Sequence, residues 1–287
     1  MRFARALSKI AAIAVWTLIL LPAQLAGLAF YRPLAVRVPL LYHRGICRLL
    51  GLHVEIWGRR TTSSPALYVS NHSSWLDITV LAKVIPGCFI SKREVANWPF
   101  FGLLARLQRS IFIERDRRLV AYHRDEISVR LENGDNLILF PEGTSGDGNH
   151  VLTFKSALFA VAEQPVRGSP LTIQPVTVAY TRLDFMPLGR HLRPYFAWYG
   201  NMPMGSHLWR VLGLGPATVV VTFHDTITIE DFASRKALAE HCHVVVAQGL
   251  SQALSGRPRG VAPEARRPAP DFFADGQLSG APTRQNS

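Results

Sequence analysis

The stretch Ala-Leu-Tyr-Val-Ser-Asn-His-Ser-Ser-Trp-Leu-Asp, residues 66–77, is the most informative part of this sequence, because it places a histidine and a carboxylate five positions apart at the end of an apolar run. Residues 66–69 are short, apolar and partly β-branched or aromatic, which predicts a buried strand that ends at Ser70 and Asn71. Ser74 is a good N-cap, and the apolar residues beyond it predict a helix. His72 therefore lies in the turn between a strand and a helix.

His72 and Asp77 are five positions apart, and within one regular helix such residues point about 140° away from each other. With His72 in the turn and Asp77 in the first helical turn, the carboxylate can reach one ring nitrogen. The other ring nitrogen can then take a proton from a substrate hydroxyl, which is the arrangement of a general base. The same residues also fit a Ser-x-x-Asp capping box, in which His72 would be an ordinary turn residue.

A second strand-like run, residues 137–139, leads into Phe-Pro-Glu-Gly-Thr-Ser at residues 140–145. A tight turn of this composition can direct backbone N–H groups at an anion, and Gly143 permits close approach. Glu142 would repel a phosphate. We therefore expect it to orient a nearby cation or the turn itself, while the backbone at Gly143 makes the anion contact. By itself, such a hexapeptide is more often a plain turn.

Together the two turns resemble the motifs of the glycerolipid acyltransferase family, the enzymes similar to 1-acylglycerol-3-phosphate acyltransferases. Asn71, His72 and Asp77 match its Asn-His-x-x-x-x-Asp block, and residues 140–144 match its Phe-Pro-Glu-Gly-Thr block. Ser-Ile-Phe-Ile-Glu-Arg at residues 110–115 supplies a middle block, and Ile-Gln-Pro-Val at residues 173–176 supplies a fourth. The resemblance covers roughly residues 50–225, with the four blocks in the family's order.

The resemblance implies that His72 is the general base and that Asp77 orients it. It places the following residues at the substrate site: Asn71, Lys92, Arg115, Glu142, Gly143 and Thr144. Arg115 is the best candidate to hold an acceptor phosphate, because a guanidinium can bind two oxygens at once.

Serine nucleophiles are not needed for this chemistry, since direct attack by an acceptor hydroxyl requires no acyl-enzyme. Ser73 and Ser74 are poorly placed as nucleophiles because they adjoin the histidine in sequence. The chain also lacks a Gly-x-Ser-x-Gly elbow. A Ser-His-Asp hydrolase is therefore the less favoured interpretation.

The charge of the chain suits a membrane surface. Lys and Arg total 32 against 20 Asp and Glu, and the net charge of +12 attracts anionic lipid, nucleic acid or acidic carrier proteins equally well. Within residues 1–60, however, the only acidic residue is Glu55, and basic residues flank an apolar run at residues 10–31. That run is close to the roughly 20 residues that span a bilayer. A basic segment around an apolar one favours an anionic membrane face over nucleic acid.

Three interpretations of this segment compete: a secretory signal peptide, a single spanning helix, and a two-helix anchor. In the third, Pro22 and Pro33 bend the chain, so that one helix dips into a leaflet and an amphipathic helix at residues 34–50 lies along the surface. We favour the third because it keeps both basic clusters on one face, the cytoplasmic face of the inner membrane.

The chain thus divides into an anchor at residues 1–50, a catalytic domain at residues 51–255 and a Pro-rich, disordered tail at residues 256–287. Its length and hydrophobic content suit one substantial α/β domain. We expect strands near residues 53–57, 66–70, 88–91, 111–114, 136–140, 171–179 and 218–223. We expect helices at residues 75–83, 94–107, 119–132 and 154–163. This alternation predicts a mixed, largely parallel central sheet flanked by helices.

The resemblance implies an O-acyltransferase that moves a fatty acyl group from acyl-CoA or acyl carrier protein to the sn-2 hydroxyl of 1-acylglycerol 3-phosphate, giving phosphatidic acid. The main alternative is a lyso-ornithine lipid O-acyltransferase, whose acceptor carries an amino-acid head group. An alternative of another class is a non-catalytic basic membrane-binding protein. The expected partners are the lysolipid, the acyl donor and membrane lipids. No metal or organic cofactor is expected, since Cys47, Cys88 and Cys242 lack metal-ligand spacing.

Overall fold

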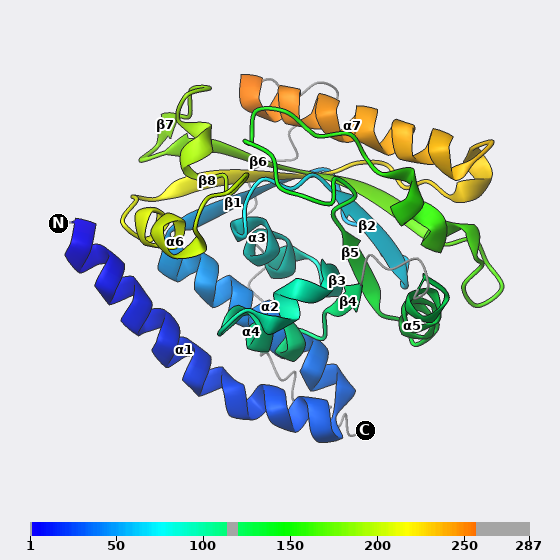
Figure 1. Ribbon diagram of the computed structural model, residues 1–287, viewed down its shortest axis with the longest axis horizontal. Coiled ribbons are helices and arrows are strands. Elements are labelled where there is room, and N and C mark those ends of the chain that lie inside the picture. Colours follow the sequence, from blue (N-terminus) through cyan, green and yellow to red (C-terminus); the bar gives the residue numbers. More distant parts are fainter. Residues whose placement is uncertain (1, 114–119, 257–287) are drawn as a thin grey trace, which may run out of the picture. The chain divides into compact units, whose positions relative to one another are not determined.

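The computed structural model describes residues 2–113 and 120–256, and its centre is a mixed, largely parallel sheet (Figure 1). The strands follow the order β1 (Leu52–Trp57), β8 (Ala217–Phe223), β6 (Thr172–Leu183), β2 (Ala66–Ser70), β5 (Asn136–Leu139), β3 (Gly87–Lys92) and β4 (Ile111–Ile113). Neighbours in this order are parallel except β8 and β6, and a short β7 (Met186–Pro187) pairs antiparallel with β6. The expected fold class is confirmed.

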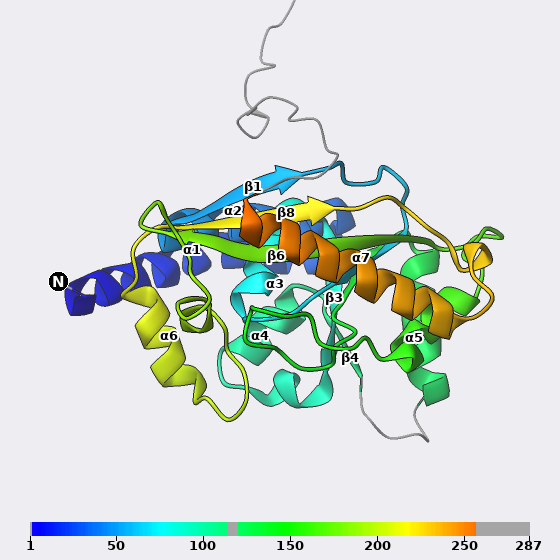
Figure 2. The same cartoon turned by 90° about the horizontal axis from the view of Figure 1, so that it is seen from above.

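Helices cover both faces of the sheet. The helix α7 (Arg235–Ser255) lies across β6 on one face, and α3 (Leu76–Val84) lies on the other with the N-terminal helices (Figure 1, Figure 2). The remaining α-helices of the described residues are α4 (Phe101–Leu107), α5 (Val120–Glu132) and α6 (Met204–Leu212). Short 3-10 helices occur at Arg93–Asn97, Ser156–Glu163, Arg193–Tyr195 and Ile229–Asp231.

The strand β2 is buried along its whole length, because apolar side chains cover it from both sides. Successive side chains of a strand point to opposite faces. Leu67 and Val69 accordingly join the apolar cluster beneath α7, whereas Tyr68 joins the cluster that contains α3. The sequence of a central parallel strand is therefore a continuous apolar run, because both of its faces are buried. His72 follows directly after the end of this strand.

The N-terminal segment folds into a hairpin of two helices, α1 (Arg2–Phe30) and α2 (Arg32–Leu50), as the two-helix interpretation expects (Figure 1). The chain turns at Tyr31, and Pro22 lies inside α1 without ending it, which corrects its expected role. Gly45 permits close approach of the helices, since a Cβ there would lie 2.3 Å from the indole nitrogen of Trp16. By length and composition alone, Phe3–Phe30 could cross a membrane.

The hairpin packs against the sheet layer, mainly through α2 on α3. The described residues consequently form one unit, and the expected boundary at residue 50 marks a change from helices to sheet. The expected Pro-rich tail lies outside the described residues, apart from Gly256.

Two expected helices differ from the structure. The expected helix at residues 94–107 is divided into a 3-10 turn, Arg93–Asn97, and α4, because Pro99 forces the preceding Trp98 into an extended conformation (ψ 130°). The expected helix at residues 154–163 is a 3-10 helix, Ser156–Glu163. The helix α6 was not expected at all.

Candidate active site

The candidate site lies at the carboxyl ends of neighbouring parallel strands. His72 follows β2, and Glu142 follows β5, whose residue Leu139 pairs with Val69 of β2. Lys92 is the last residue of β3, the next strand along the sheet. Parallel strands end at one edge of a sheet, so their turns meet there. The backbone N–H of His72 donates to Glu142 Oε1 at 2.6 Å and joins the two turns.

His72 and Asp77 form the expected pair. The distance between His72 Nδ1 and Asp77 Oδ2 is 3.0 Å, and Asp77 is fully buried. The same carboxylate oxygen accepts the backbone N–H groups of Ser73 at 2.7 Å and Ser74 at 2.8 Å. Its other oxygen accepts the hydroxyl of Tyr180 at 2.8 Å. Asp77 therefore holds the imidazole while the turn and β6 hold Asp77.

Only half of the expected capping box forms, and it coexists with the histidine–carboxylate pair. Asp77 accepts the N–H of Ser74, as the third residue of a capping box does, but Ser74 Oγ accepts the N–H of Leu76 at 3.3 Å, and the N–H of Asp77 donates to Ser74 O instead. The cap brings the carboxylate back over the turn, where His72 lies. In the described part of the chain, no hydrogen bond joins the hydroxyl of Ser73 or Ser74 to the imidazole.

The imidazole of His72 is held by stacking as well as by Asp77. It lies on the ring of Phe140 with a centroid distance of 4.1 Å and an interplanar angle of 19°. The side chain is 17% exposed, and in residues 2–113 and 120–256 no protein group bonds Nε2. With Nδ1 bound to a carboxylate, Nε2 is the nitrogen that can accept a proton from a hydroxyl.

Glu142 holds the turn rather than a substrate. It is 2% exposed, and Oε2 accepts the N–H of Leu152 at 3.0 Å while Oε1 accepts that of His72. Burial raises the pKa of Glu142 to about 8, although these two hydrogen bonds act in the opposite direction. Of the two expectations for this carboxyl group, the structure matches orientation of the turn.

Asn71 and Gly143 have structural partners where substrate contacts were expected. The amide of Asn71 donates to Val178 O at 2.9 Å and accepts Val178 N at 2.8 Å, so the side chain continues the pairing of β2 with β6. The N–H of Gly143 donates to Phe140 O at 3.1 Å, which removes it as the expected anion donor. Gly143 has φ +66°, and a Cβ there would lie 2.7 Å from Lys155 Nζ. The ammonium of Lys155 thus lies beside the turn.

Three further residues were expected at the substrate site: Thr144, Lys92 and Arg115. Thr144 is exposed in the turn, and Lys92 is partly exposed at the end of β3. Arg115 lies outside the described residues. Among the described residues, no group of three or more His, Cys, Asp or Glu side chains is arranged to hold a metal ion.

Three contributors to the site could not be found from the sequence blocks. Tyr180 bonds Asp77 from β6, Lys155 lies against Gly143, and Trp198 donates its backbone N–H to Ser73 O at 2.8 Å. Ser145 donates its hydroxyl to Trp198 O, which ties the second turn to the same loop. The only signal for Tyr180 was that it follows the fourth block on an apolar strand.

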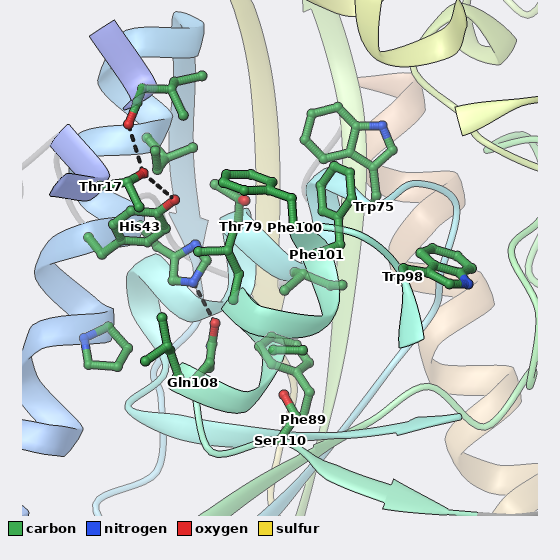
Figure 3. Close-up of a pocket in the computed structure, with 18 of the residues that line it drawn as sticks. Thr17, His43, Trp75, Thr79, Phe89, Trp98, Phe100, Phe101, Gln108 and Ser110 are labelled. Atoms are coloured by element: carbon green, nitrogen blue, oxygen red, sulfur yellow. Dashed lines mark hydrogen bonds between the residues drawn. The ribbon is translucent and has the colours of Figure 1, made fainter. Parts of the chain in front are cut away.

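An apolar cavity of about 560 Å³ adjoins the site (Figure 3). Side chains of α1, α2, α3, α4 and α6 line it, so its walls are the N-terminal hairpin and the helices facing it. Phe89 lines the cavity and stacks on Phe140 with a centroid distance of 5.9 Å, and Phe140 stacks on His72. Three stacked rings therefore connect the cavity to His72. Its size and apolar lining suit a hydrocarbon chain.

Comparison with known proteins identifies the family. A family model described as Acyltransferase matches residues 53–179. The chain is also 38% identical over 273 residues to a protein of Rhizobium meliloti (strain 1021) named lyso-ornithine lipid O-acyltransferase, covering 92% of this chain and 93% of that protein. The chain belongs to the glycerolipid acyltransferase family. Its relatives support an acyltransferase acting on a lysolipid, and they favour this activity over a non-catalytic binding protein.

A further relative and a solved structure extend the comparison. This acyltransferase is 30% identical over 219 residues to the 1-acyl-sn-glycerol-3-phosphate acyltransferase of Neisseria meningitidis serogroup B (strain ATCC BAA-335 / MC58), covering 74% of this chain and 81% of that protein. The crystal structure of the 1-acyl-sn-glycerophosphate acyltransferase from Thermotoga maritima has a TM-score of 0.63 and 21% identity, over 90% of this chain and 99% of that chain. This last likeness shows a shared fold.

Proposed function

We propose that this acyltransferase is a lyso-ornithine lipid O-acyltransferase. The observation that carries the proposal is the difference between the two groups of relatives. The lyso-ornithine lipid enzyme of Rhizobium meliloti is 38% identical over 93% of its length, whereas the glycerophosphate enzyme of Neisseria meningitidis is 30% identical over 81%. The proposal therefore places the amino-acid head group ahead of the phosphate that we first expected.

The acceptor must offer a hydroxyl, because the reaction is an O-acyl transfer. Ornithine has two amines and a carboxylate but no hydroxyl, so the hydroxyl belongs to the acyl chain attached to ornithine. An acceptor of this kind brings a hydrocarbon chain and a head group of mixed charge to His72 together. The apolar cavity beside His72 offers room for hydrocarbon.

In the proposed reaction, His72 Nε2 removes the proton of the acceptor hydroxyl while its oxygen attacks the thioester carbonyl carbon. Asp77, 3.0 Å from Nδ1, stabilises the imidazolium. The tetrahedral intermediate collapses with cleavage of the carbon–sulfur bond, and the imidazolium returns its proton to the leaving thiolate. The ammonium of Lys155 beside Gly143 is our candidate to stabilise the oxyanion.

Two opposite charges near the second turn are available to an amino-acid head group: Asp147 in the loop after that turn, and Arg193 at the start of a 3-10 helix. Gly148, which follows Asp147, lies against Arg193, since a Cβ there would be 3.8 Å from the Cβ of Ser73 and 3.9 Å from that of Arg193. Although burial alone would raise the pKa of Asp147, hydrogen bonds from Asn149 hold it below the usual value, so this residue is anionic at neutral pH. Arg193 binds Asn149 Oδ1 at 3.0 Å, and its buried Nε has no partner among the described residues.

Because Asp147 and Arg193 carry opposite charges, they favour an ornithine head group over a phosphate. Arg193 can bind a carboxylate, and Asp147 can bind an ammonium. A phosphate would gain from Arg193 but would be repelled by Asp147. We therefore assign Asp147 and Arg193 to the head group, and Arg115, Lys92 and Thr144 stay candidates from the sequence.

We further propose that the enzyme acts at the cytoplasmic face of the inner membrane, with acyl-CoA or acyl carrier protein as donor and no cofactor. The outer side of α1 is apolar, with Val15, Leu18 and Ile19 each more than half exposed. Such a surface is unfavourable in water and suits the interfacial region of a bilayer.

A competition assay tests the acceptor. Detergent-solubilised enzyme receives labelled acyl donor with lyso-ornithine lipid and lysophosphatidic acid together, and a His72→Ala variant serves as the blank. We expect the label in ornithine lipid. Label in phosphatidic acid would restore the first expectation, and label in neither would remove both.

A matched pair of variants tests the head-group assignment. Asp147→Asn should raise the KM for lyso-ornithine lipid about tenfold, the effect of losing one charge-assisted contact. Glu240→Gln removes an equivalent charge from the exposed surface of α7 and should leave KM unchanged. An equal KM in Asp147→Asn and wild type would place the ammonium elsewhere.

A further inference from the structure

Three polar side chains interrupt the apolar cavity at one end. They are Gln24 of α1, His43 of α2 and Gln108, which follows α4, and they are 5%, 7% and 8% exposed. All three line the cavity. Figure 3 shows His43 and Gln108 joined by a hydrogen bond on the side of the cavity away from Trp75 and Trp98. We call Gln24, His43 and Gln108 the polar cluster.

The hydrogen bonds within the polar cluster leave one donor and two acceptors unused. His43 Nε2 lies 2.6 Å from Gln108 Oε1, and since a carbonyl oxygen can only accept, His43 Nε2 carries the proton. His43 Nδ1 is then an acceptor, and Gln108 Nε2 is a donor. Neither has a partner, and the same is true of Gln24 Oε1 among the described residues.

Gln24 is fixed beside Gln108 by its own amide. Gln24 Nε2 donates to Leu107 O at 2.6 Å and to Ala35 O at 3.3 Å, which ties all three helices together. Burial lowers the pKa of His43 to about 4, so the imidazole is neutral at pH 7 and the pattern of donors and acceptors is constant there. The polar cluster is thus held in place with its unpaired atoms buried.

Unpaired buried polar atoms are unfavourable, and each is stabilised when a ligand atom pairs with it. A saturated hydrocarbon chain cannot do so. A ketone or ether can only accept and would leave both acceptors unpaired, while an ammonium can only donate. A hydroxyl does both: it can accept from Gln108 Nε2 and donate to Gln24 Oε1.

We propose that the polar cluster is a binding site for a hydroxyl carried on the hydrocarbon chain of an acyl substrate. This hydroxyl differs from the one that reacts at His72, because the polar cluster lies at the opposite end of the cavity from Trp75 of the His72 turn (Figure 3). The enzyme then selects hydroxylated chains over plain chains of equal length. The proposal rests on the proposed function only in that the cavity holds an acyl chain.

A binding measurement tests the hydroxyl site without turnover. The full-length protein in detergent is titrated calorimetrically with palmitate and with a series of hydroxypalmitates that differ only in the position of the hydroxyl. We expect one position to bind about tenfold more tightly than palmitate, since its hydroxyl pairs atoms that are otherwise unsatisfied. Equal affinity for palmitate and every hydroxypalmitate would show that only water occupies the polar cluster and would overturn the proposal.

Two variants locate the effect. Gln108→Leu removes the only unpaired donor of the polar cluster and should abolish the preference for the hydroxylated chain, whereas Leu208→Met, at an apolar position of the same cavity, should preserve it. A preference that survives in Gln108→Leu would overturn the assignment. Because binding is measured without acceptor, the result is independent of whether label reaches ornithine lipid in the competition assay.

Discussion

In the turn at His72 and in the polar cluster at His43, a histidine forms a hydrogen bond to a buried side chain. The two regions differ in how many of their other polar atoms have hydrogen-bond partners. In the turn, Asp77 binds His72, Ser73, Ser74 and Tyr180, and Glu142 accepts two backbone N–H groups. In the polar cluster, one short bond between His43 and Gln108 is surrounded by three unpaired atoms. Folding alone completes the first region, and the second is complete only with a ligand.

The largest effect should follow removal of His72, the side chain of the turn that we propose as the base. His72→Ala should lower kcat by about 10²–10⁴-fold, because the acceptor hydroxyl loses its base. Initial rates with saturating lysolipid measure the effect, and thermal unfolding reports separately the loss of the bond to Asp77 and of the stacking on Phe140. His53→Ala, at an exposed position of β1, is the control. Turnover at the wild-type rate would remove His72 from the mechanism.

Removal of the Asp77 carboxylate should lower stability as well as activity, and this would separate the fully paired turn from the polar cluster more clearly. Asp77→Ala leaves the N–H groups of Ser73 and Ser74 and the hydroxyl of Tyr180 buried without their partner. We expect a loss of about 2–5 kcal/mol in the free energy of unfolding, measured with urea. The exposed Asp225→Ala should cost little. A fully stable Asp77→Ala protein would mean that the turn does not depend on its pairing.

Glu142 should make stability depend on pH. Burial raises its pKa in the folded protein from 4.5 to about 8, so between these values the folded state binds a proton that the unfolded state releases. The stabilisation is therefore fully present below about pH 4.5 and is lost as the pH rises through about 8. Urea unfolding across this range should show the decline, and Glu142→Gln should remove that part of it. Identical slopes in both proteins would contradict a raised pKa.

The smallest effect should come from the polar cluster. Replacing both hydrogen-bonded partners by apolar side chains, in His43→Leu combined with Gln108→Leu, removes buried polar atoms that lack partners. We expect the free energy of unfolding to change by no more than about 1 kcal/mol, in either direction. A loss as large as that of Asp77→Ala would show that the polar cluster is a structural network like the turn.

The sequence predicted those parts of the site that depend on local geometry. His72 and Asp77 are joined by one strand end and one helix start, so their contact follows from a short stretch of backbone. Glu142 was harder, because its two partners are N–H groups of other segments. Tyr180 could not be assigned, since its bond to Asp77 spans 103 positions and requires β6 to lie beside β2.

Contacts between residues that are distant in the sequence were also the parts of the remaining structure that could not be predicted. Seven strands were predictable because each contains an apolar run between polar turns, whereas the two-residue β7 was not expected. The polar cluster combines residues from α1, α2 and the end of α4, and only their packing shows that Gln24, His43 and Gln108 face one cavity. Pro99 was visible in the sequence, yet the break it causes was missed because the apolar periodicity continues on either side.

The helix α1 has two apolar sides, and this has a kinetic consequence. Ile13 and Leu20 line the cavity, while Leu18 and Ile19 are exposed on the outside. With α1 embedded as proposed, a single helix separates the cavity from the lipid, so the acceptor need not pass through water. The rate should then follow the mole fraction of lysolipid in the membrane, and dilution with inert lipid should slow the enzyme even when the bulk lysolipid concentration is constant.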